Sequence, residues 1–370
     1  MTPSLGQLIR TSRIIVCCGA GGVGKTTTAA SVGLAAARLG RRVLVLTIDP
    51  SKRLAEALGV AQDHPTPQPP PAAALTAAGI HAPACLDVWM LDPRHISQQA
   101  VKRLTRTPEE AALLMENRIF QNLSSMLAGM QEYTAMEALH GFVTRGRYDL
   151  VVLDTPPSRN ALDFLESPGR LLHFFDGRIF QFFLPRKESA FRNAAGKLIG
   201  RAFSAVFGDG FYSELQEFLS VFTSIFSSLT RNADEMRAEL ARSDSTFLLV
   251  TSPAQEALTE ALFFQEKTRQ LGLPFRGFIL NRSHAREVEL SYPGVEHLGS
   301  SPSPAALSGL KKLQLLARTE QEAALRDKAL LQQLETRAGE GAFAMALPSL
   351  RGGVDDIPTL VRISDELMKG

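Results

Sequence analysis

The sequence predicts an α/β fold in which a doubly wound, mostly parallel sheet carries helices on both faces. Short aliphatic and β-branched runs alternate with helical patterns, which is typical of crossover units between parallel strands. One such run, Arg13–Cys18, precedes a glycine-rich loop and an alanine-rich helix, Lys25–Leu39, that Gly40 would terminate. Apolar residues make up 45% of the 370-residue chain, enough for a large buried core.

Seven segments are predicted to be strands because each is a short apolar run. They are Arg13–Cys18, Val43–Ile48, Asp87–Leu91, Leu150–Asp154, Thr246–Thr251, Phe275–Leu280 and Phe343–Leu347. The chain is long for one compact domain, yet a single elaborated α/β domain reaches this size, so residues 1–370 are expected to form one domain.

A proline-rich run, Asp63–Pro71, interrupts this pattern. Its prolines remove backbone donors and fix φ, which disfavours both helix and sheet. Residues 63–84, in which this run continues into an alanine-rich stretch, are therefore predicted to be an exposed loop.

Charge and cysteine content limit the function. The formal net charge of +2 argues against nucleic acid as a partner. The three cysteines, Cys17, Cys18 and Cys85, form no CxxC pair, which favours a reducing compartment and no structural zinc. Neither a signal peptide nor an apolar stretch of about 18 residues is found. We expect a soluble cytoplasmic protein that is not integral to a membrane.

The middle of the chain is rich in phenylalanine. Of the 21 phenylalanines, 13 fall between Phe164 and Phe226, among helix-forming residues. Apolar residues recur there at helical spacing, loosely over Leu171–Leu184 and then clearly at Leu215, Phe218, Leu219, Phe222, Ile225, Phe226 and Leu229. A helical subdomain inserted at about 168–242 is predicted.

The segment from Gly19 to Thr26, GAGGVGKT, matches the GxxxxGK[ST] pattern of a phosphate-binding loop. Glycines let successive backbone amides converge on a phosphate, and the following helix adds its positive end. Lys25 would reach the β- and γ-phosphates, and the Thr26 hydroxyl would bind Mg²⁺. The predicted phosphate-binding residues are Gly19, Ala20, Gly21, Gly22, Val23, Gly24, Lys25, Thr26 and Thr27.

Two aspartates end predicted strands, where ligands of open α/β sheets bind. Asp49 could orient or deprotonate the attacking water, or could instead cap the helix that follows Pro50. Asp154 follows four aliphatic residues, which is the Walker-B arrangement for holding Mg²⁺ directly or through water. Its alternative is a loop-capping role.

The chain resembles the ArsA-type ATPases, which include arsenite pump ATPases and guided-entry ATPases that target tail-anchored membrane proteins. Three motifs carry the resemblance: GGVGKTTTAA (Gly21–Ala30), TIDPSKRL (Thr47–Leu54) and LVVLDTPPS (Leu150–Ser158). Two weaker matches are GFILNR (Gly277–Arg282) and ALPSLRGGVDDI (Ala346–Ile357). Their order and span imply a member with one ATPase domain.

The resemblance implies roles for individual residues. Asp49 matches the residue that positions the hydrolytic water, and Asp154 matches the switch II aspartate. Asn281 matches the residue that contacts adenine, and the segment from Pro348 to Asp355 matches the loop over the base. ATP and Mg²⁺ are the implied ligands, and a dimer that handles a hydrophobic helical client is the implied assembly.

Departures from the family pattern qualify these implications. The wider class has a lysine that crosses the dimer interface where this chain has Ala20, so hydrolysis is expected to be slow in the chain alone. A paralogue that bears the lysine could complete a heterodimer. No CxxC pair follows Asn281, so neither a zinc site nor an arsenite site is expected.

Several functions stay open. The phenylalanine-rich insert, with Phe218, Phe222 and Phe226 as the candidate client or dimer surface, could be either a client groove or simply core. The chain could be an ATPase that couples nucleotide binding and hydrolysis to dimer closure and client handling. Alternatively, it could be a catalytically weak assembly subunit of a heterodimer or a positioning ATPase of the MinD/ParA type.

Overall fold

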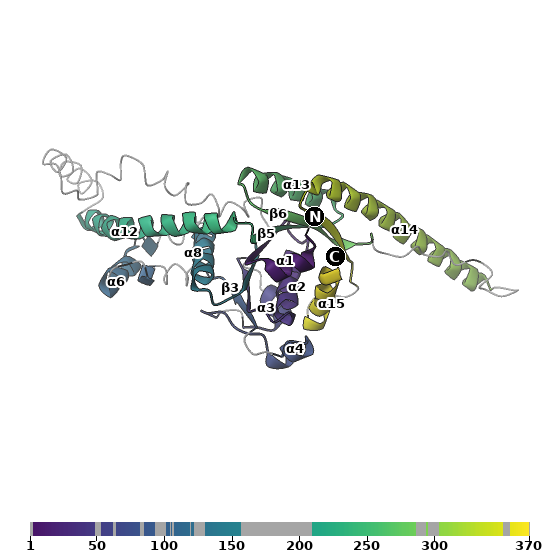
Figure 1. Ribbon diagram of the computed structural model, residues 1–370, viewed down its shortest axis with the longest axis horizontal. Coiled ribbons are helices and arrows are strands. Elements are labelled where there is room, and N and C mark those ends of the chain that lie inside the picture. Colours follow the sequence, from purple (N-terminus) through teal and green to yellow (C-terminus); the bar gives the residue numbers. More distant parts are fainter. Residues whose placement is uncertain are drawn as a thin grey trace.

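A seven-stranded sheet forms the centre of the molecule in the computed structural model (Figure 1). Its strand order is β3-β2-β4-β1-β5-β6-β7, and every neighbouring pair is parallel. The structure describes residues 3–48, 53–61, 64–81, 85–92, 101–103, 105, 107–118, 120–121, 130–156, 209–285, 294, 303–350 and 356–369.

All seven predicted strands are confirmed. They are β1 (Ile14–Cys18), β2 (Val43–Thr47), β3 (Leu86–Met90), β4 (Leu150–Asp154), β5 (Ser245–Thr251), β6 (Phe275–Ser283) and β7 (Phe343–Pro348). The largest difference is at β6, which continues past the predicted end at Leu280 to Ser283. The first part of this strand is apolar, but its last residues are polar, so the hydrophobic pattern alone stops too early.

Helices cover both faces of the sheet, which confirms the doubly wound prediction. One core cluster joins the sheet to α1 (Leu5–Thr11), α2 (Lys25–Arg38), α3 (Arg53–Leu58) and α15 (Ile357–Lys369). The other joins it to α8 (Met130–Arg145), α12 (Asp209–Leu240), α13 (Gln255–Gln270) and α14 (Pro304–Ala338). Side chains of β1 alternate between the clusters, as expected for a strand buried on both faces.

The central helix α2 follows the phosphate-binding loop and ends one residue before the predicted boundary at Leu39. Gly40 then adopts a left-handed conformation with φ of +82°, as its predicted terminating role requires. Small alanine side chains let α2 lie close to the sheet and to α15, where Leu360 is fully buried.

Residues 63–84 differ from the predicted exposed loop where the structure describes them. Gln68 forms an antiparallel bridge with Val88 of edge strand β3, and the alanine-rich stretch forms α4 (Ala72–Ala77). Leu75 is buried, and the Trp89 indole donates to the carbonyl of His64 at 3.0 Å. High alanine helix propensity and the open backbone groups of an edge strand explain this ordering.

The phenylalanine-rich region is described from Asp209 onward, where α12 confirms the helical periodicity of Leu215–Leu229. The run Leu171–Leu184 and the predicted insert start near residue 168 lie outside the described residues. Asn232 of α12 donates to Glu137 of α8 at 2.9 Å, and Asn117, after α6 (Pro108–Glu116), donates to the Glu214 carbonyl at 2.9 Å.

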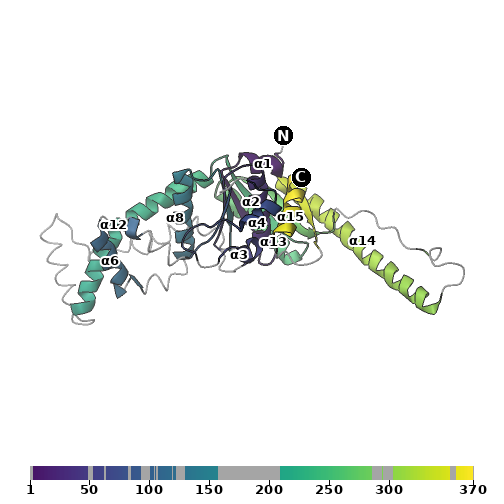
Figure 2. The same cartoon turned by 90° about the horizontal axis from the view of Figure 1, so that it is seen from below.

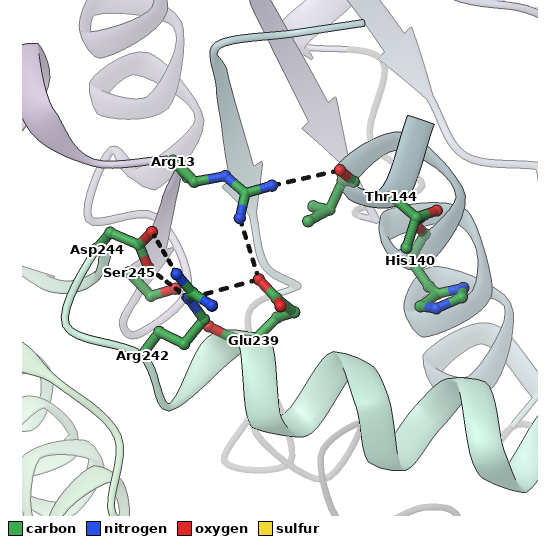
Figure 3. A network of polar contacts seen from close by, with 8 residues as sticks. Arg13, His140, Thr144, Glu239, Arg242, Asp244 and Ser245 are labelled. Carbon is green, nitrogen blue, oxygen red and sulfur yellow. Dashed lines mark hydrogen bonds and ion pairs between the residues drawn. The ribbon is translucent and has the colours of Figure 1, made fainter. Parts of the chain in front are cut away.

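A polar network joins the end of α12 to the sheet (Figure 3). Arg13, which precedes β1, pairs with Glu239 at 3.3 Å and donates to the carbonyl of Val143 in α8 at 3.4 Å. The Ser245 hydroxyl at the start of β5 donates to the carbonyl of Glu239 at 2.8 Å. The last turn of α12 is therefore fixed to β1, β5 and α8.

From the sheet, α12 and α14 extend in opposite directions (Figures 1 and 2). Within the part of the chain that the structure describes, no helix has the length and apolar character needed to cross a membrane.

Replacement of Leu360 by alanine should lower the free energy of unfolding by about 2–5 kcal/mol, because a fully buried leucine leaves a cavity between α15 and the sheet. The matched control is Leu113→Ala on α6, where the side chain is 42% exposed and little change is expected. Urea unfolding followed by circular dichroism measures both. Equal effects of the two substitutions would contradict the assignment of Leu360 to the core.

Candidate functional site

The loop between β1 and α2 depends on two glycines. Gly19 has φ of +148°, and a Cβ there would lie 2.1 Å from the backbone oxygen of Val250. Gly24, the N-cap of α2, has φ of +93°, and a Cβ there would lie 2.2 Å from the amide nitrogen of Asn281. Both positions combine a left-handed backbone with close contact, so no other residue type fits without rearrangement.

Lys25 lies at the first position of α2 and is only 5% exposed. Its ammonium group donates to the carbonyl of Ala20 at 2.7 Å, so the loop closes around the amine. The N-terminus of α2 directs the backbone amides of its first turn to the same place. Positive charge and amide donors therefore converge on the loop, as anion binding requires.

The other predicted loop residues line the two sides of this cradle. Ala20 and Val23 are buried, Gly21 and Gly22 are exposed, and Thr26 and Thr27 are partly buried in the first turn of α2. The loop thus presents glycine backbone outward and apolar side chains inward.

Asp154 lies at the end of β4 and is fully buried. Its Oδ2 accepts a hydrogen bond from the Thr26 hydroxyl at 2.7 Å and another from the Thr47 hydroxyl at 3.0 Å. The carboxylate is thus held beside the phosphate-binding loop by hydroxyl groups of α2 and β2. This geometry supports the Walker-B interpretation over loop capping.

The sheet topology explains why these groups meet. β1 lies between β4 and β5. From β1 the chain passes to β2, which lies beyond β4, whereas after β4 it continues on the opposite side of β1, at β5. The strand order therefore switches at β1. The register pairs Asp154 with Cys17 of β1 and with Thr47 of β2. No local sequence pattern indicates a role for Thr47, and its contact with Asp154 follows only from the pairing of β2 with β4.

Cys17 and Cys18 are buried in β1 beside this site. Burial raises the pKa of both thiols, and that of Cys18 reaches about 12. The Asp154 carboxylate raises the Cys17 pKa further, since a thiolate beside a carboxylate is unfavourable. Both groups therefore stay protonated near neutral pH and pack within the strand.

Asn281 contacts the phosphate-binding loop from β6. Its side-chain amide donates to the carbonyl of Val23 at 2.8 Å. The pairing of β6 with β7 shifts between Leu280 and Ser283, and Arg282 adopts φ of +56°. This irregularity leaves Asn281 outside the regular ladder and explains how a side chain of β6 reaches a loop that follows β1.

The end of β6 is held in turn by α14. Asp327 is fully buried, and its carboxylate accepts from the backbone amide of His284 at 2.9 Å and from the Ser283 hydroxyl at 3.4 Å. Arg326 forms an ion pair with the same carboxylate at 3.0 Å. Asp327 therefore fixes the backbone three residues after Asn281. No local sequence pattern indicates this role of Asp327.

The remaining predicted residues are only partly placed. Pro348 ends β7 and pairs in register with Ser283, while Asp49 and Asp355 lie outside the described residues. Phe218 is 2% exposed within one chain, which favours core at that position. The side chains of Phe222 and Phe226 lie outside the described part of the structure.

Comparison with known proteins gives matches to one family. The family model described as anion-transporting ATPase matches residues 12–290. The chain is 25% identical over 256 residues to a putative arsenical pump-driving ATPase 1 of Aquifex aeolicus, covering 67% of this chain and 58% of that protein. It is 26% identical over 171 residues to the ATPase GET3 of Malassezia globosa, covering 46% and 47%.

A third relative is matched over more of its length. The chain is 22% identical over 285 residues to the ATPase ASNA1 homolog 1 of Paramecium tetraurelia, covering 76% of this chain and 78% of that protein. The matched region nevertheless spans only about half the length of the Aquifex and Malassezia proteins.

The glycine geometry leads to a prediction. Gly19→Ala should lower the free energy of unfolding by about 2–4 kcal/mol, because the new methyl group meets the rigid backbone oxygen of Val250. Gly22→Ala is the matched control, since its φ is also positive but a Cβ meets nothing within 4 Å, and a cost of about 1 kcal/mol is expected. Equal losses in urea unfolding would argue against the close contact at Gly19.

Proposed function

The chain belongs to the anion-transporting ATPase family, and on that premise we propose that it binds Mg-ATP at residues 19–27 and hydrolyses it. The main observation in support of this proposal is that Lys25, Thr26 and Asp154 converge on one glycine-lined cradle at the carboxyl edge of the sheet. Amide donors, a buried cation and a carboxylate beside a hydroxyl are the groups that phosphoryl transfer to water needs.

The donor set fits magnesium. Mg²⁺ prefers oxygen ligands and keeps several of its waters, and the Thr26 hydroxyl and Asp154 carboxylate are 2.7 Å apart. These two residues would hold the ion, Thr26 directly and Asp154 directly or through water. The bound ion would supply positive charge that neutralises the phosphate oxygens.

The chain's own residues divide the remaining tasks. The Lys25 amine would exchange its bond to the Ala20 carbonyl for oxygens of the β- and γ-phosphates. The amides of the loop and of the α2 N-terminus would bind the β-phosphate. Asp49 would orient the attacking water, while Asn281, with the segment from Pro348 to Asp355, would contact adenine.

Ala20 weakens the proposed site. Its methyl group is 7% exposed and carries no charge toward the phosphates. We infer slow hydrolysis by the chain alone, because a cation that approaches the γ-phosphate only in the transition state can contribute several kcal/mol. A nucleotide-dependent assembly subunit, paired with a paralogue that supplies the lysine, is the second candidate function that Ala20 favours.

The assembly is also part of the proposal. ATP binding would close a dimer, as a homodimer or with a related paralogue, and the helical region that contains α12 would handle a hydrophobic helix. The support is indirect: the last turn of α12 is fixed to Arg13, just before β1, and to Ser245 at the start of β5, and these two strands run from there to the nucleotide site at their carboxyl ends (Figure 3). Movement at the site would reach this helix along the length of β1 and β5. Three free cysteines suit a cytoplasmic setting.

Two substitutions test the site. Lys25→Ala and Asp154→Asn should each lower the ATP hydrolysis rate by about 100-fold or more, because each removes a charge that acts on the triphosphate or its metal. Lys328→Ala, an exposed change on α14, is the control and should retain the full rate. Phosphate release measures all three. Unchanged hydrolysis in both site variants would place the activity elsewhere or in a contaminant.

A gain of function tests the role of position 20. Ala20→Lys should raise turnover by about tenfold or more if the chain forms a homodimer, because each copy then offers a cation to its partner's phosphates. Ala20→Arg, which keeps the charge with a different shape, is the companion variant. No gain in either, with nucleotide affinity and fold intact, would count against slow hydrolysis as a consequence of Ala20.

A further inference from the structure

Helix α14 is 35 residues long, and only its C-terminal part contributes to the main core. Leu334 and Ala338 are buried against the sheet, and Asp327 reaches the end of β6. Toward its N-terminus the helix extends away from the body of the molecule in both views (Figures 1 and 2). This projecting part leaves several leucine side chains exposed to solvent.

One face of the projecting part has a regular pattern, which we name the outer stripe. Its members recur every three or four residues and all are exposed: Leu307, Lys311, Leu315, Arg318, Glu322 and Leu325. At 3.6 residues per turn they fall within an arc of about 80°, opposite the face that carries Asp327, Leu334 and Ala338. Leu315 is 66% exposed and Leu325 is 61% exposed.

The stripe complements itself when it is reversed. Two antiparallel copies, related by a two-fold axis between positions 315 and 318, place Lys311 opposite Glu322 twice. The same arrangement brings Leu307 of one copy near Leu325 of the other and places Leu315 of each copy opposite the Arg318 side chain of the other at the centre. A parallel pair would instead oppose Lys311 to Lys311 and Glu322 to Glu322. Self-complementarity of this kind is what a two-fold interface requires.

We propose that the outer stripe is a docking surface for a second copy of this chain, in an antiparallel helix pair. The charges favour this occupant over a lipid surface, because the stripe combines two basic side chains with an acidic one and is not a uniformly basic face. One helix pair over about five turns buries less than a standard interface, so the expected dimer is weak and depends on concentration. The contact does not depend on nucleotide and is separate from the dimer proposed above.

Charge reversal tests the proposal. Sedimentation velocity of the full chain without nucleotide should show a mass that rises with concentration. Lys311→Glu or Glu322→Lys should weaken the association by about tenfold each, because either change turns two attractive contacts into repulsive ones. The double variant should restore it to within about threefold. Lys312→Glu, an exposed reversal off the stripe, is the control and should associate like the wild type.

Three results would overturn the proposal: a chain that stays monomeric at every concentration, single reversals that behave like Lys312→Glu, or a double variant that stays as weak as the single variants. Leu315→Arg provides a second check, since it places a second cation opposite Arg318 of the partner copy twice and should abolish association. Loss of ATP binding in Lys25→Ala should leave this association unchanged, which separates a failure here from a failure of the proposed ATPase function.

Discussion

The contact between Thr26 and Asp154 is the constraint on which the rest of the site depends. It joins the first turn of α2 to the end of β4, and it exists because β1 and β4 are neighbours in the sheet. Asp154 is fully buried, so its charge must be met by hydroxyl donors on adjacent elements. A sheet with another strand order would leave the cradle without its carboxylate.

Two further contacts extend this constraint outward. Asn281 binds the carbonyl of Val23, and Asp327 of α14 fixes the chain just beyond Asn281. At the opposite edge of the sheet, where the strands begin, the end of α12 is fixed to Arg13 and to Ser245 of β5. The long helices extend to opposite sides of the molecule (Figure 2), and they are held at opposite edges of the sheet: α14 at the carboxyl edge, where the nucleotide site lies, and the last turn of α12 at the amino edge. A change at the phosphate-binding loop therefore has its shorter route to α14, through Asn281 and the end of β6.

The sequence predicts the parts of this arrangement that are local. Apolar runs identify all seven strands, and the glycine and lysine spacing identifies the cradle, because both signals lie within a few consecutive residues. Thr47, Asp327 and the contact of Asn281 with Val23 could not be predicted this way, since each joins segments more than 40 residues apart and depends on strand order and register. The bridge between Gln68 and Val88 joins nearer segments, but it too depends on β3 being an edge strand, which no local pattern shows.

The central claim is that the loop of residues 19–24 and Lys25 form a triphosphate pocket. Isothermal titration of the full chain with a non-hydrolysable ATP analogue and Mg²⁺ tests it most directly, with AMP as the comparison ligand. The account predicts one saturable site per chain with a dissociation constant below about 1 mM, and much weaker binding of AMP, which lacks the phosphates that Lys25 would hold. Equal binding of the two nucleotides, or no binding of either, would contradict it.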